Sequence, residues 1–334
     1  MKHLEVTDER IRVDGLYWWQ ETKPHLWRLP PRYQERVPEK VWSLAQRPTG
    51  ARVRFRTNAS ALVFNMTWPN FTQQDNMSRW GAGGCDVWID DIFFRAKGPG
   101  VKPTPGICWF SGIAPEWREV CVYLPTYTQM VLDGIEVDNK GEVLPPTTSY
   151  ALDEPLVIYG TSITQGGCAG RASMTWPAIL ARNLNLDFIN LGFSGAGRGE
   201  PVMAEILGTM DACAYIVDLG YNHKTAPEFA ESFPVFLDIL LAARPDVPIV
   251  CTSPTYCTMD DYSGNARLPD MRTITREVVQ ERQERGAKLS VVDGCDLIGP
   301  DDRDGIVDIA HLNDLGMQLF AERLEPTVTR AMGL

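Results

Sequence analysis

One stretch of the chain, residues 156–166, restricts the fold more than any other. It reads Leu156-Val-Ile-Tyr-Gly-Thr-Ser-Ile-Thr-Gln-Gly166, and a further glycine follows at Gly167. Its first four residues are apolar or aromatic, which is typical of a short buried strand. The strand runs into a glycine-flanked turn that carries Ser162, and α/β folds present nucleophilic side chains on turns of this kind. Because an ordinary turn with a capping serine has the same pattern, the rest of the chain must decide.

After residue 150 the chain alternates short apolar runs with amphipathic helical segments. Expected strands are Leu156–Tyr159, Phe188–Leu191, Ala214–Leu219, Ile249–Thr252 and Leu289–Val292. Expected helices cover about residues 175–185, 201–209, 227–243, 268–285 and 314–332. Alternation with short connections predicts a parallel sheet with helices on both faces. Ligands bind such sheets at the carboxyl ends of the strands, so the residues after each strand deserve most weight.

The first half of the chain is rich in β-strand patterns instead. Residues 52–57 and 61–68 alternate apolar and polar side chains, and similar runs follow up to residue 137. Many short strands separated by glycine and proline predict an antiparallel sandwich, or jelly roll, and no strong helix is expected before residue 150. The polar, proline-containing segment 138–150 is the expected boundary between a domain of residues 1–145 and one of residues 150–334.

Charge and composition exclude several classes of function. The net charge of −11 argues against a nucleic-acid-binding surface and against binding to anionic membranes. The N-terminus lacks the apolar segment of a secretory signal, and the apolar runs are too short to span a bilayer. The eight cysteines are scattered without a Cys-x-x-Cys pair, which favours a reduced, cytoplasmic protein. Whether the protein forms a homo-oligomer stays open.

Polar residues follow the expected strands, and together they fit nucleophilic acyl transfer. A serine hydroxyl such as that of Ser162 needs a base to take its proton, and His311 can be that base. Asp308, three residues before His311, can accept a hydrogen bond from the imidazole and stabilise its charged form. The backbone N–H groups of Ser162 and Gly195 and the side-chain amide of Asn222 are available to stabilise an oxyanion.

Four blocks of the second half resemble those of the SGNH (GDSL-type) hydrolase superfamily, in the order in which that family has them. The blocks are Gly160-Thr-Ser-Ile-Thr-Gln-Gly166, Asn190-Leu-Gly-Phe-Ser-Gly195, Gly220-Tyr-Asn222 and Asp308-Ile-Ala-His311. Thr161 stands where the family often has aspartate, and His223 replaces the last aspartate of its Gly-x-Asn-Asp block. The segment Gly84-Cys-Asp-Val-Trp88 resembles the Gly-x-Asp-Leu-Tyr signature of an N-terminal sandwich domain found on some members.

The resemblance implies a fold and an activity. The fold is a flavodoxin-like three-layer α/β/α domain preceded by an antiparallel, jelly-roll-like β-sandwich. The activity is that of a serine esterase that removes small acyl groups, acetyl above all, from a carbohydrate or a similar small molecule. An acyltransferase that uses the same acyl-enzyme, and a carbohydrate-binding protein on an inactive scaffold, are the alternatives. Thr161, Tyr221 and His223 are further candidates for contact with the substrate, although His223 could equally form a hydrogen bond only to a neighbouring loop.

The remaining sequence patterns are weaker indications of function. Cys168 lies near Ser162 in sequence, and a catalytic thiol is conceivable there. No Cys/His spacing indicates a zinc site, the residues around Asp302 fail the calcium-loop pattern, and no cofactor is expected. Gly195, Asn222 and Asp308 could each be ordinary loop residues. The tryptophans that crowd the first half could stack on sugars, but we expect them mainly to build the sandwich core and the seam between the domains.

Overall fold

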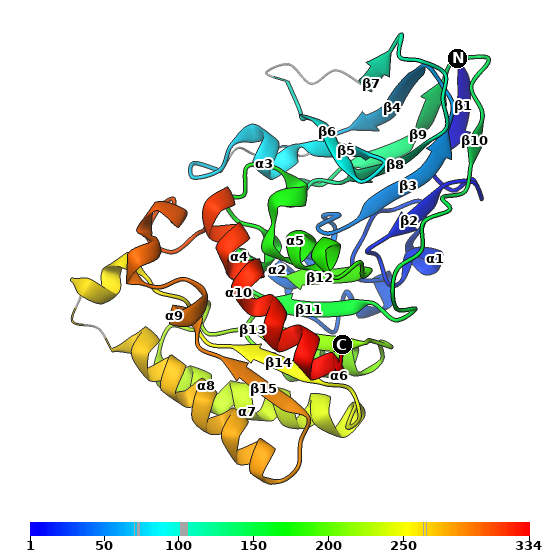
Figure 1. Ribbon diagram of the computed structural model, residues 1–334. Helices are drawn as coiled ribbons and strands as arrows, with labels where there is room; N and C mark the ends of the chain where they lie inside the picture. Colours follow the sequence, from blue (N-terminus) through cyan, green and yellow to red (C-terminus); the bar gives the residue numbers. More distant parts are fainter. Residues whose placement is uncertain (70, 72–73, 101–105, 263, 265) are drawn as a thin grey trace.

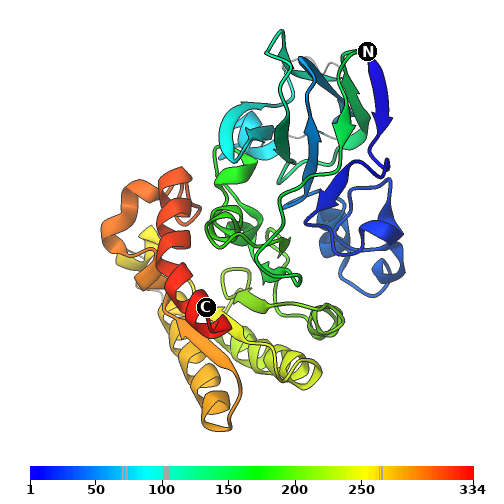
Figure 2. The ribbon, with the colours of Figure 1, turned by 45° about the vertical axis from the view of Figure 1, so that its right-hand side comes forward.

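The chain forms one parallel sheet and two antiparallel sheets in the residues that the computed structural model describes (Figure 1). These are residues 1–334 except 70, 72–73, 101–105, 263 and 265. Figure 2 shows the antiparallel sheets gathered above the parallel sheet and its helices, with the N-terminus at the top of the antiparallel part. The expected combination of a β-sandwich and an α/β/α domain is confirmed.

The parallel sheet has the strand order β12-β11-β13-β14-β15, which is the flavodoxin-like order. Its strands are β11 (Leu156–Gly160), β12 (Phe188–Gly192), β13 (Ala214–Asp218), β14 (Ile249–Thr252) and β15 (Leu289–Val292). Each lies within one residue of the strand expected from sequence. The register places Gly160 opposite both Gly192 and Asp218, so the carboxyl ends of the three neighbouring strands lie level.

Helices cover both faces of this sheet. The first face carries α5 (Trp176–Asn183) and α10 (Asp314–Met332), and the second carries α6 (Pro201–Gly208), α7 (Ala226–Ala243) and α8 (Arg267–Glu284). Leu156 and Ile158 face the first core, whereas Val157 and Tyr159 face the second, and all four are fully buried. A strand buried on both faces must be apolar throughout, which explains why its sequence signal is a run rather than an alternation.

The antiparallel sheets pack face to face as a sandwich. One sheet has the order β1-β9-β4-β7, with β1 (Lys2–Glu5), β9 (Val131–Val137), β4 (Ala61–Thr67) and β7 (Ile107–Ser111). The other sheet has the order β10-β3-β8-β5-β6, and β2 pairs with β3 beside this path. Its strands are β2 (Arg12–Asp14), β3 (Arg52–Thr57), β5 (Cys85–Ile89), β6 (Ile92–Lys97), β8 (Arg118–Tyr123) and β10 (Val143–Leu144). Phe55, Phe64 and Trp109 are fully buried in the core of the sandwich.

The first half also contains short helices that the sequence pattern did not indicate. They are α1 (Trp19–Thr22), α2 (Glu39–Ala45) and α3 (Arg79–Gly83). Trp18 and the apolar side of α2 join the same apolar cluster as Tyr159, so this segment covers the α/β core. Trp68 and Trp109 lie in the sandwich core as expected, whereas Trp80 is 51% exposed.

Buried arginines cross from the first half of the chain to the strand ends of the second. Arg28 is fully enclosed, and its guanidinium donates to the carbonyls of Asn190 (3.0 Å), Gly192 (2.7 Å) and Leu44 (2.8 Å). Burial, and secondarily the charge of Arg47, lowers the pKa of Arg28 to about 9. The buried guanidinium of Arg28 therefore holds the carboxyl end of β12 in place. This strand leads into the loop that contains Gly195.

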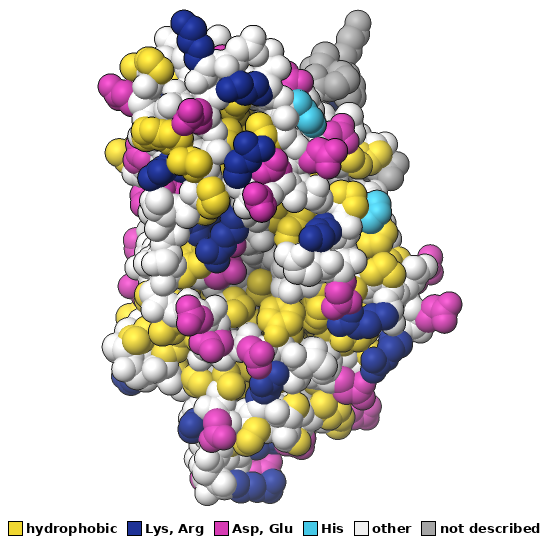
Figure 3. All heavy atoms as spheres, turned by 90° about the vertical axis from the view of Figure 1, so that its right-hand side faces the viewer, with side chains coloured by type: hydrophobic (Ala, Val, Ile, Leu, Met, Phe, Trp, Pro, Cys, Tyr) yellow, Lys and Arg dark blue, Asp and Glu magenta, His cyan; other side chains and the backbone are white. Residues whose placement is uncertain are grey.

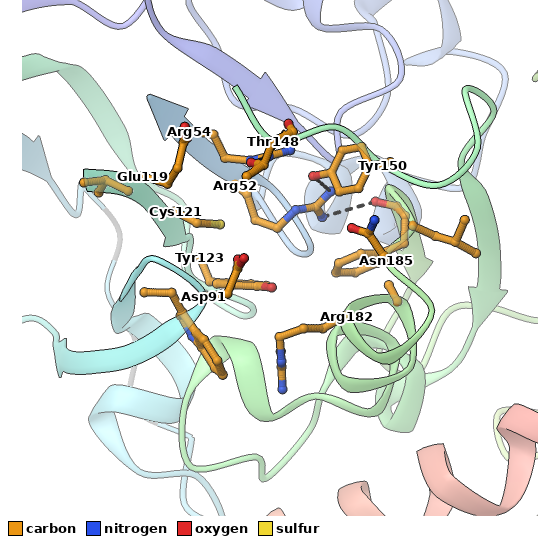
Figure 4. Close-up of a pocket in the computed structure, with 15 residues that line it drawn as sticks. Arg52, Arg54, Asp91, Glu119, Cys121, Tyr123, Thr148, Tyr150, Arg182 and Asn185 are labelled. Atoms are coloured by element: carbon orange, nitrogen blue, oxygen red, sulfur yellow. Dashed lines mark hydrogen bonds between the residues drawn. The ribbon is translucent and has the colours of Figure 1, made fainter. Parts of the chain in front are cut away.

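A second arginine crosses the seam beside a cavity of about 310 Å³. Arg52 of β3 pairs with Asp187, which immediately precedes β12, and stacks 4.3 Å from the ring of Phe188. Figure 4 shows Arg52, Arg54 and Tyr150 on one side of this cavity and Arg182 on the other. Because Phe188 is the first residue of β12, the cavity lies at the amino end of the parallel sheet, opposite the edge that carries Ser162.

The surface beside the N-terminal strands mixes both signs of charge. Figure 3 shows acidic and basic side chains interspersed with small apolar areas on this face, without a block of one sign. In the part of the chain that the structure describes, every helix is too short or too polar to span a bilayer.

Asp86, the aspartate of the Gly84–Trp88 signature, connects the sandwich to the α/β half. Its carboxylate accepts hydrogen bonds from the N–H of Ser173 at 3.2 Å to both oxygens and pairs with Arg171 at 3.4 Å. Burial raises the pKa of Asp86 to about 6, against the opposing effects of Ser173 and Arg171. The signature aspartate is therefore a contact between the domains, and the segment that it holds leads from the Ser162 turn into α5.

The raised pKa of Asp86 predicts a pH-dependent stability. Between the ordinary pKa of 3.8 and about 6, the unfolded chain ionises Asp86 while the folded chain keeps it protonated. Stability from this group is thus present below pH 4 and lost as the pH rises through 6. In Asp86→Asn this dependence is absent, so the wild type should lose about 1–3 kcal/mol relative to the variant between pH 4 and 7.

Denaturant unfolding of both proteins across that pH range measures the difference. Asp91→Asn, an exposed change in the hairpin that follows β5, is the control and should track the wild type. Parallel stability curves for the wild type and Asp86→Asn would show that Asp86 does not titrate in this way.

Candidate active site

Ser162 sits on the turn at the carboxyl end of β11, as the first residue of the short helix α4 (Ser162–Gln165). Thr161 caps this helix, because its side-chain oxygen accepts a hydrogen bond from the N–H of Ile163 at 3.4 Å. The helix ends at once at Gly166, whose φ of +97° suits glycine. Ser162 is 9% exposed.

A buried hydrogen-bond network lies beneath this turn. The carboxylate of Asp218, at the end of β13, accepts from the hydroxyls of Thr164 (2.6 Å) and Thr252 (3.0 Å). Burial raises the pKa of Asp218, while hydrogen bonds from Thr164, Thr252 and Thr161 act in the opposite sense. The network links the turn that carries Ser162 to the ends of β13 and β14. It therefore holds Ser162 in place relative to the sheet.

Ser162, His311 and Asp308 form a continuous hydrogen-bond chain. The Oγ of Ser162 lies 2.8 Å from Nε2 of His311, and Nδ1 of the same ring lies 2.7 Å from Oδ2 of Asp308. These distances suit a hydroxyl that donates to Nε2 and an Nδ1–H that donates to the carboxylate. The structure thus brings together the three residues that the sequence singled out for nucleophile, base and orienting acid, although Ser162 lies 149 positions from His311 in the chain.

Asp308 is held ionised by its own loop. Its Oδ1 accepts from the N–H groups of Ile309 (2.5 Å), Ala310 (2.9 Å) and His311 (3.0 Å). Partial burial would raise the pKa of Asp308, but the hydrogen bonds from Ala310, His311 and Asn76 outweigh it and hold the pKa well below its usual range. The carboxylate is therefore charged at neutral pH, as an orienting group must be.

Two residues of the first half, Asn76 and Tyr127, contact these three residues, and no sequence motif marks either of them. The side-chain amide of Asn76 donates to Oδ2 of Asp308 at 2.9 Å, the same oxygen that faces His311. The hydroxyl of Tyr127 donates to the backbone carbonyl of Ser162 at 3.0 Å. The β-rich half is therefore part of the site, since it supplies hydrogen bonds to both ends of the chain of three.

The oxyanion donors expected from sequence lie on adjacent loops. Gly195 has a φ of +64°, and its carbonyl accepts from Nζ of Lys40 at 3.3 Å. The amide nitrogen of Asn222 donates to the carbonyls of Gly197 (2.9 Å) and Phe193 (3.3 Å), which flank Gly195. Asn222 therefore shapes the Gly195 loop in this structure. To bind an oxyanion it must exchange one of these carbonyls, and the roles of Gly195 and Asn222 stay predictions.

The three further candidates have structural partners. Thr161 is fully buried as the helix cap, and the hydroxyl of Tyr221 donates to the carbonyl of Thr255 at 2.8 Å. His223 is 4% exposed, with Nε2 at 2.9 Å from the hydroxyl of Ser232 on α7, and burial lowers its pKa. The partner of His223 thus lies on helix α7 and not on a loop, and contact of His223 with the substrate stays a prediction.

Cys168 lies beside the same chain but is a poor candidate for a nucleophile. Burial, and then the charge of Asp308, raises the pKa of the Cys168 thiol to about 12, so the reactive thiolate is scarce at neutral pH. Within the described residues, Cys168, Asp308 and His311 are the group whose side chains could together hold a metal ion.

Models of known protein families match both parts of the chain. Residues 153–329 match the model of the GDSL-like lipase/acylhydrolase family, and residues 1–142 match that of the N-terminus of SGNH-hydrolase-type esterases. A search of curated protein sequences found no match.

Solved structures extend the likeness over nearly the whole chain. A Bacteroides ovatus protein described as a GDSL-like lipase has a TM-score of 0.90 and 25% identity, covering 99% of this chain and 98% of its own. The salicylyl-acyltransferase SsfX3 of a tetracycline biosynthetic pathway has a TM-score of 0.84 and 20% identity, covering 100% and 98%. The acetyl xylan esterase Est2A of the rumen bacterium Butyrivibrio proteoclasticus has a TM-score of 0.65 and 14% identity, covering 100% of both chains.

The contact of Asn76 with Asp308 predicts a role in positioning the acid. Asn76→Ala should lower kcat for ester cleavage by roughly three- to tenfold, because the carboxylate loses one hydrogen bond that holds it toward His311. KM and the free energy of unfolding should change little, since the side chain is exposed. Steady-state kinetics and denaturant unfolding measure these quantities. Asp75→Ala on the same loop is the control, and an equal kcat in Asn76→Ala and the control would remove Asn76 from the site.

Proposed function

Since the chain belongs to the GDSL-like lipase/acylhydrolase family, we propose that it is a serine esterase that works through an acyl-enzyme on Ser162. The observation that supports this most directly is the hydrogen bond of 2.8 Å between Ser162 Oγ and His311 Nε2, extended by Asp308. Such a chain raises the nucleophilicity of a hydroxyl that is otherwise a poor nucleophile at neutral pH. An inactive binding protein would have no need to keep all three side chains aligned.

In the proposed mechanism, Ser162 Oγ attacks the ester carbonyl while Nε2 of His311 takes its proton. Asp308 holds the Nδ1–H tautomer and stabilises the imidazolium that forms. The tetrahedral oxyanion receives hydrogen bonds from the N–H groups of Ser162 and Gly195, and from Asn222 once its amide turns away from a carbonyl. His311 then gives its proton to the departing alcohol. Water, activated by the same imidazole, hydrolyses the acyl-enzyme and frees Ser162.

For the substrate, we propose an ester with a small acyl group, acetyl above all, on a carbohydrate or a similar alcohol. The low exposure of Ser162, at 9%, is the observation on which we base the choice of a short acyl chain. The likeness to the acetyl xylan esterase Est2A concerns the fold, and it supports the carbohydrate part of the proposal only as an analogy. A series of p-nitrophenyl esters from acetyl to octanoyl, followed by acetylated sugars, tests the acyl and the alcohol parts separately.

An acyltransferase is the second candidate, because the salicylyl-acyltransferase SsfX3 shares the whole two-part architecture at a TM-score of 0.84. The two functions share the acyl-enzyme and differ in what accepts the acyl group. Product analysis by mass spectrometry, with and without an acceptor alcohol, separates them. Free acid formed at the same rate in both conditions indicates an esterase, whereas acceptor-dependent turnover with an acylated product indicates a transferase.

Replacement of the nucleophile is the first test. Ser162→Ala should lower kcat/KM for p-nitrophenyl acetate by roughly 10³-fold or more, because no acyl-enzyme can form. The fold should survive, since the hydrogen bonds of the turn come from the backbone of Ser162. Ser111→Ala, an exposed serine at the end of β7, is the matched control and should retain the wild-type rate. Equal turnover by the wild type and Ser162→Ala would refute the proposed mechanism.

A further inference from the structure

Three side chains of different ligand chemistry meet beside Ser162. They are the thiol of Cys168, the carboxylate of Asp308 and the imidazole of His311, and one ligand atom from each lies within 4.8 Å of the others. The group could not be recognised from the sequence, because its members come from distant parts of the chain. Cys168 belongs to the loop after α4, whereas Asp308 and His311 precede α10. No local spacing of cysteine and histidine marks it.

The loop that carries Cys168 is held against the histidine loop at several points. At Gly167 an added Cβ would lie 3.0 Å from Cδ2 of His311, so the backbone packs directly on the imidazole. The N–H of Gly170 donates to Oδ1 of Asp314, the first residue of α10, at 2.6 Å. The N–H of Ser173 is fixed by Asp86 of the sandwich. The approach of Cys168 to Asp308 and His311 is thus a consequence of packing at both ends of its loop.

The surroundings suit a soft cation. Cys168 is 8% exposed and packs in an apolar cluster with Met77, Ala82 and Tyr127, which shields the sulfur from water. On the open side, Asp308 supplies a negative charge that a cation would partly neutralise. Thiolate, imidazole and carboxylate are the ligands that Zn²⁺ takes, at about 2.0–2.3 Å from the metal.

The separations need only modest adjustment. Ligand atoms around a tetrahedral zinc lie roughly 3.2–3.8 Å apart, as follows from those bond lengths. Here Nδ1 of His311 and Oδ2 of Asp308 are 2.7 Å apart, and the widest separation in the group is no more than 4.8 Å. Opening the first pair and closing the others by about an ångström forms three ligands and leaves a fourth position for water, as in sites that exchange their metal.

We propose that Cys168, Asp308 and His311 form a binding site for a thiophilic divalent cation such as Zn²⁺ or Cd²⁺, and that occupation of this site switches off ester cleavage. The effect on cleavage rests on the proposed function of Ser162 and His311, whereas the binding itself does not. On binding, the sulfur–metal bond forms as the thiol proton leaves to solvent, and no electron is transferred.

Inhibition follows from the tautomers of His311. A neutral imidazole carries one proton, and a metal bound at Nδ1 leaves that proton on Nε2, where it blocks acceptance of the proton of Ser162. A metal bound at Nε2 occupies the acceptor directly. Metal ligation replaces the hydrogen bond between Nδ1 and Asp308 in the first case and the hydrogen bond between Nε2 and Ser162 in the second, so the chain of three is interrupted either way.

The activity experiment titrates Zn²⁺ into wild type, Cys168→Ala and Cys108→Ser during hydrolysis of p-nitrophenyl acetate. Each protein is compared with its own metal-free rate. Cys168→Ala should need at least about tenfold more metal for half-inhibition, as expected for the loss of one ligand. Cys108→Ser, which removes an exposed thiol on β7, should behave as the wild type, and a chelator should restore activity. Equal sensitivity of wild type and Cys168→Ala would overturn the proposal.

The binding experiment is independent of activity. Cd²⁺ is titrated into the wild type, Ser162→Ala, Cys108→Ser and Cys168→Ala, and the ultraviolet absorption of the cadmium–thiolate bond is recorded. The band should saturate at one equivalent in the first three proteins and be lost in Cys168→Ala. If Ser162→Ala shows undiminished hydrolysis but binds Cd²⁺, the proposed function fails while the site stands. Absence of the band in the wild type, or its persistence in Cys168→Ala, would show that the site does not exist.

Discussion

The buried carboxylate of Asp218 is the interaction on which the position of Ser162 depends. It accepts hydrogen bonds from the hydroxyls of Thr164 and Thr252, and thereby ties the turn after β11 to the ends of β13 and β14. The parallel register had already placed Gly160 level with Asp218, so little backbone adjustment is needed. A serine on a turn fixed in this way can meet a histidine supplied from the far end of the chain.

The first half of the chain is more than an attachment. Asn76 reaches the acid, Tyr127 reaches the backbone of the nucleophile, and Asp86 fixes the segment that follows the Ser162 turn. Arg28 adds four hydrogen bonds to backbone carbonyls, two of them at the end of β12. The likeness to the Bacteroides ovatus structure likewise extends over 99% of this chain and does not end at the α/β half.

Local patterns were enough to predict much of this structure. The strands of the parallel sheet are apolar runs bounded by glycine, proline or polar residues. Ser162 follows the first of these strands, whereas Asp308 and His311 were identified from their own Asp-x-x-His block before the last helix. Contacts such as Asn76 with Asp308 join residues 232 positions apart and leave no periodic trace in the sequence. Helix α2 was not predicted, because its seven residues are too few to show a clear helical periodicity of apolar side chains. The hydrogen bond of His223 to Ser232 likewise depends on how α7 packs, which the sequence pattern does not specify.

The aligned side chains of Ser162, His311 and Asp308 imply a hydroxyl of unusual reactivity, and a covalent label reads this property directly. The full-length protein is incubated with a fluorophosphonate, and its intact mass and peptide map are recorded. One phosphonyl group should be found, attached to Ser162, and prior denaturation should abolish the labelling. A protein that remains unlabelled under native conditions, or that is labelled at another residue with Ser162 unmodified, would contradict the assignment of Ser162 as the nucleophile.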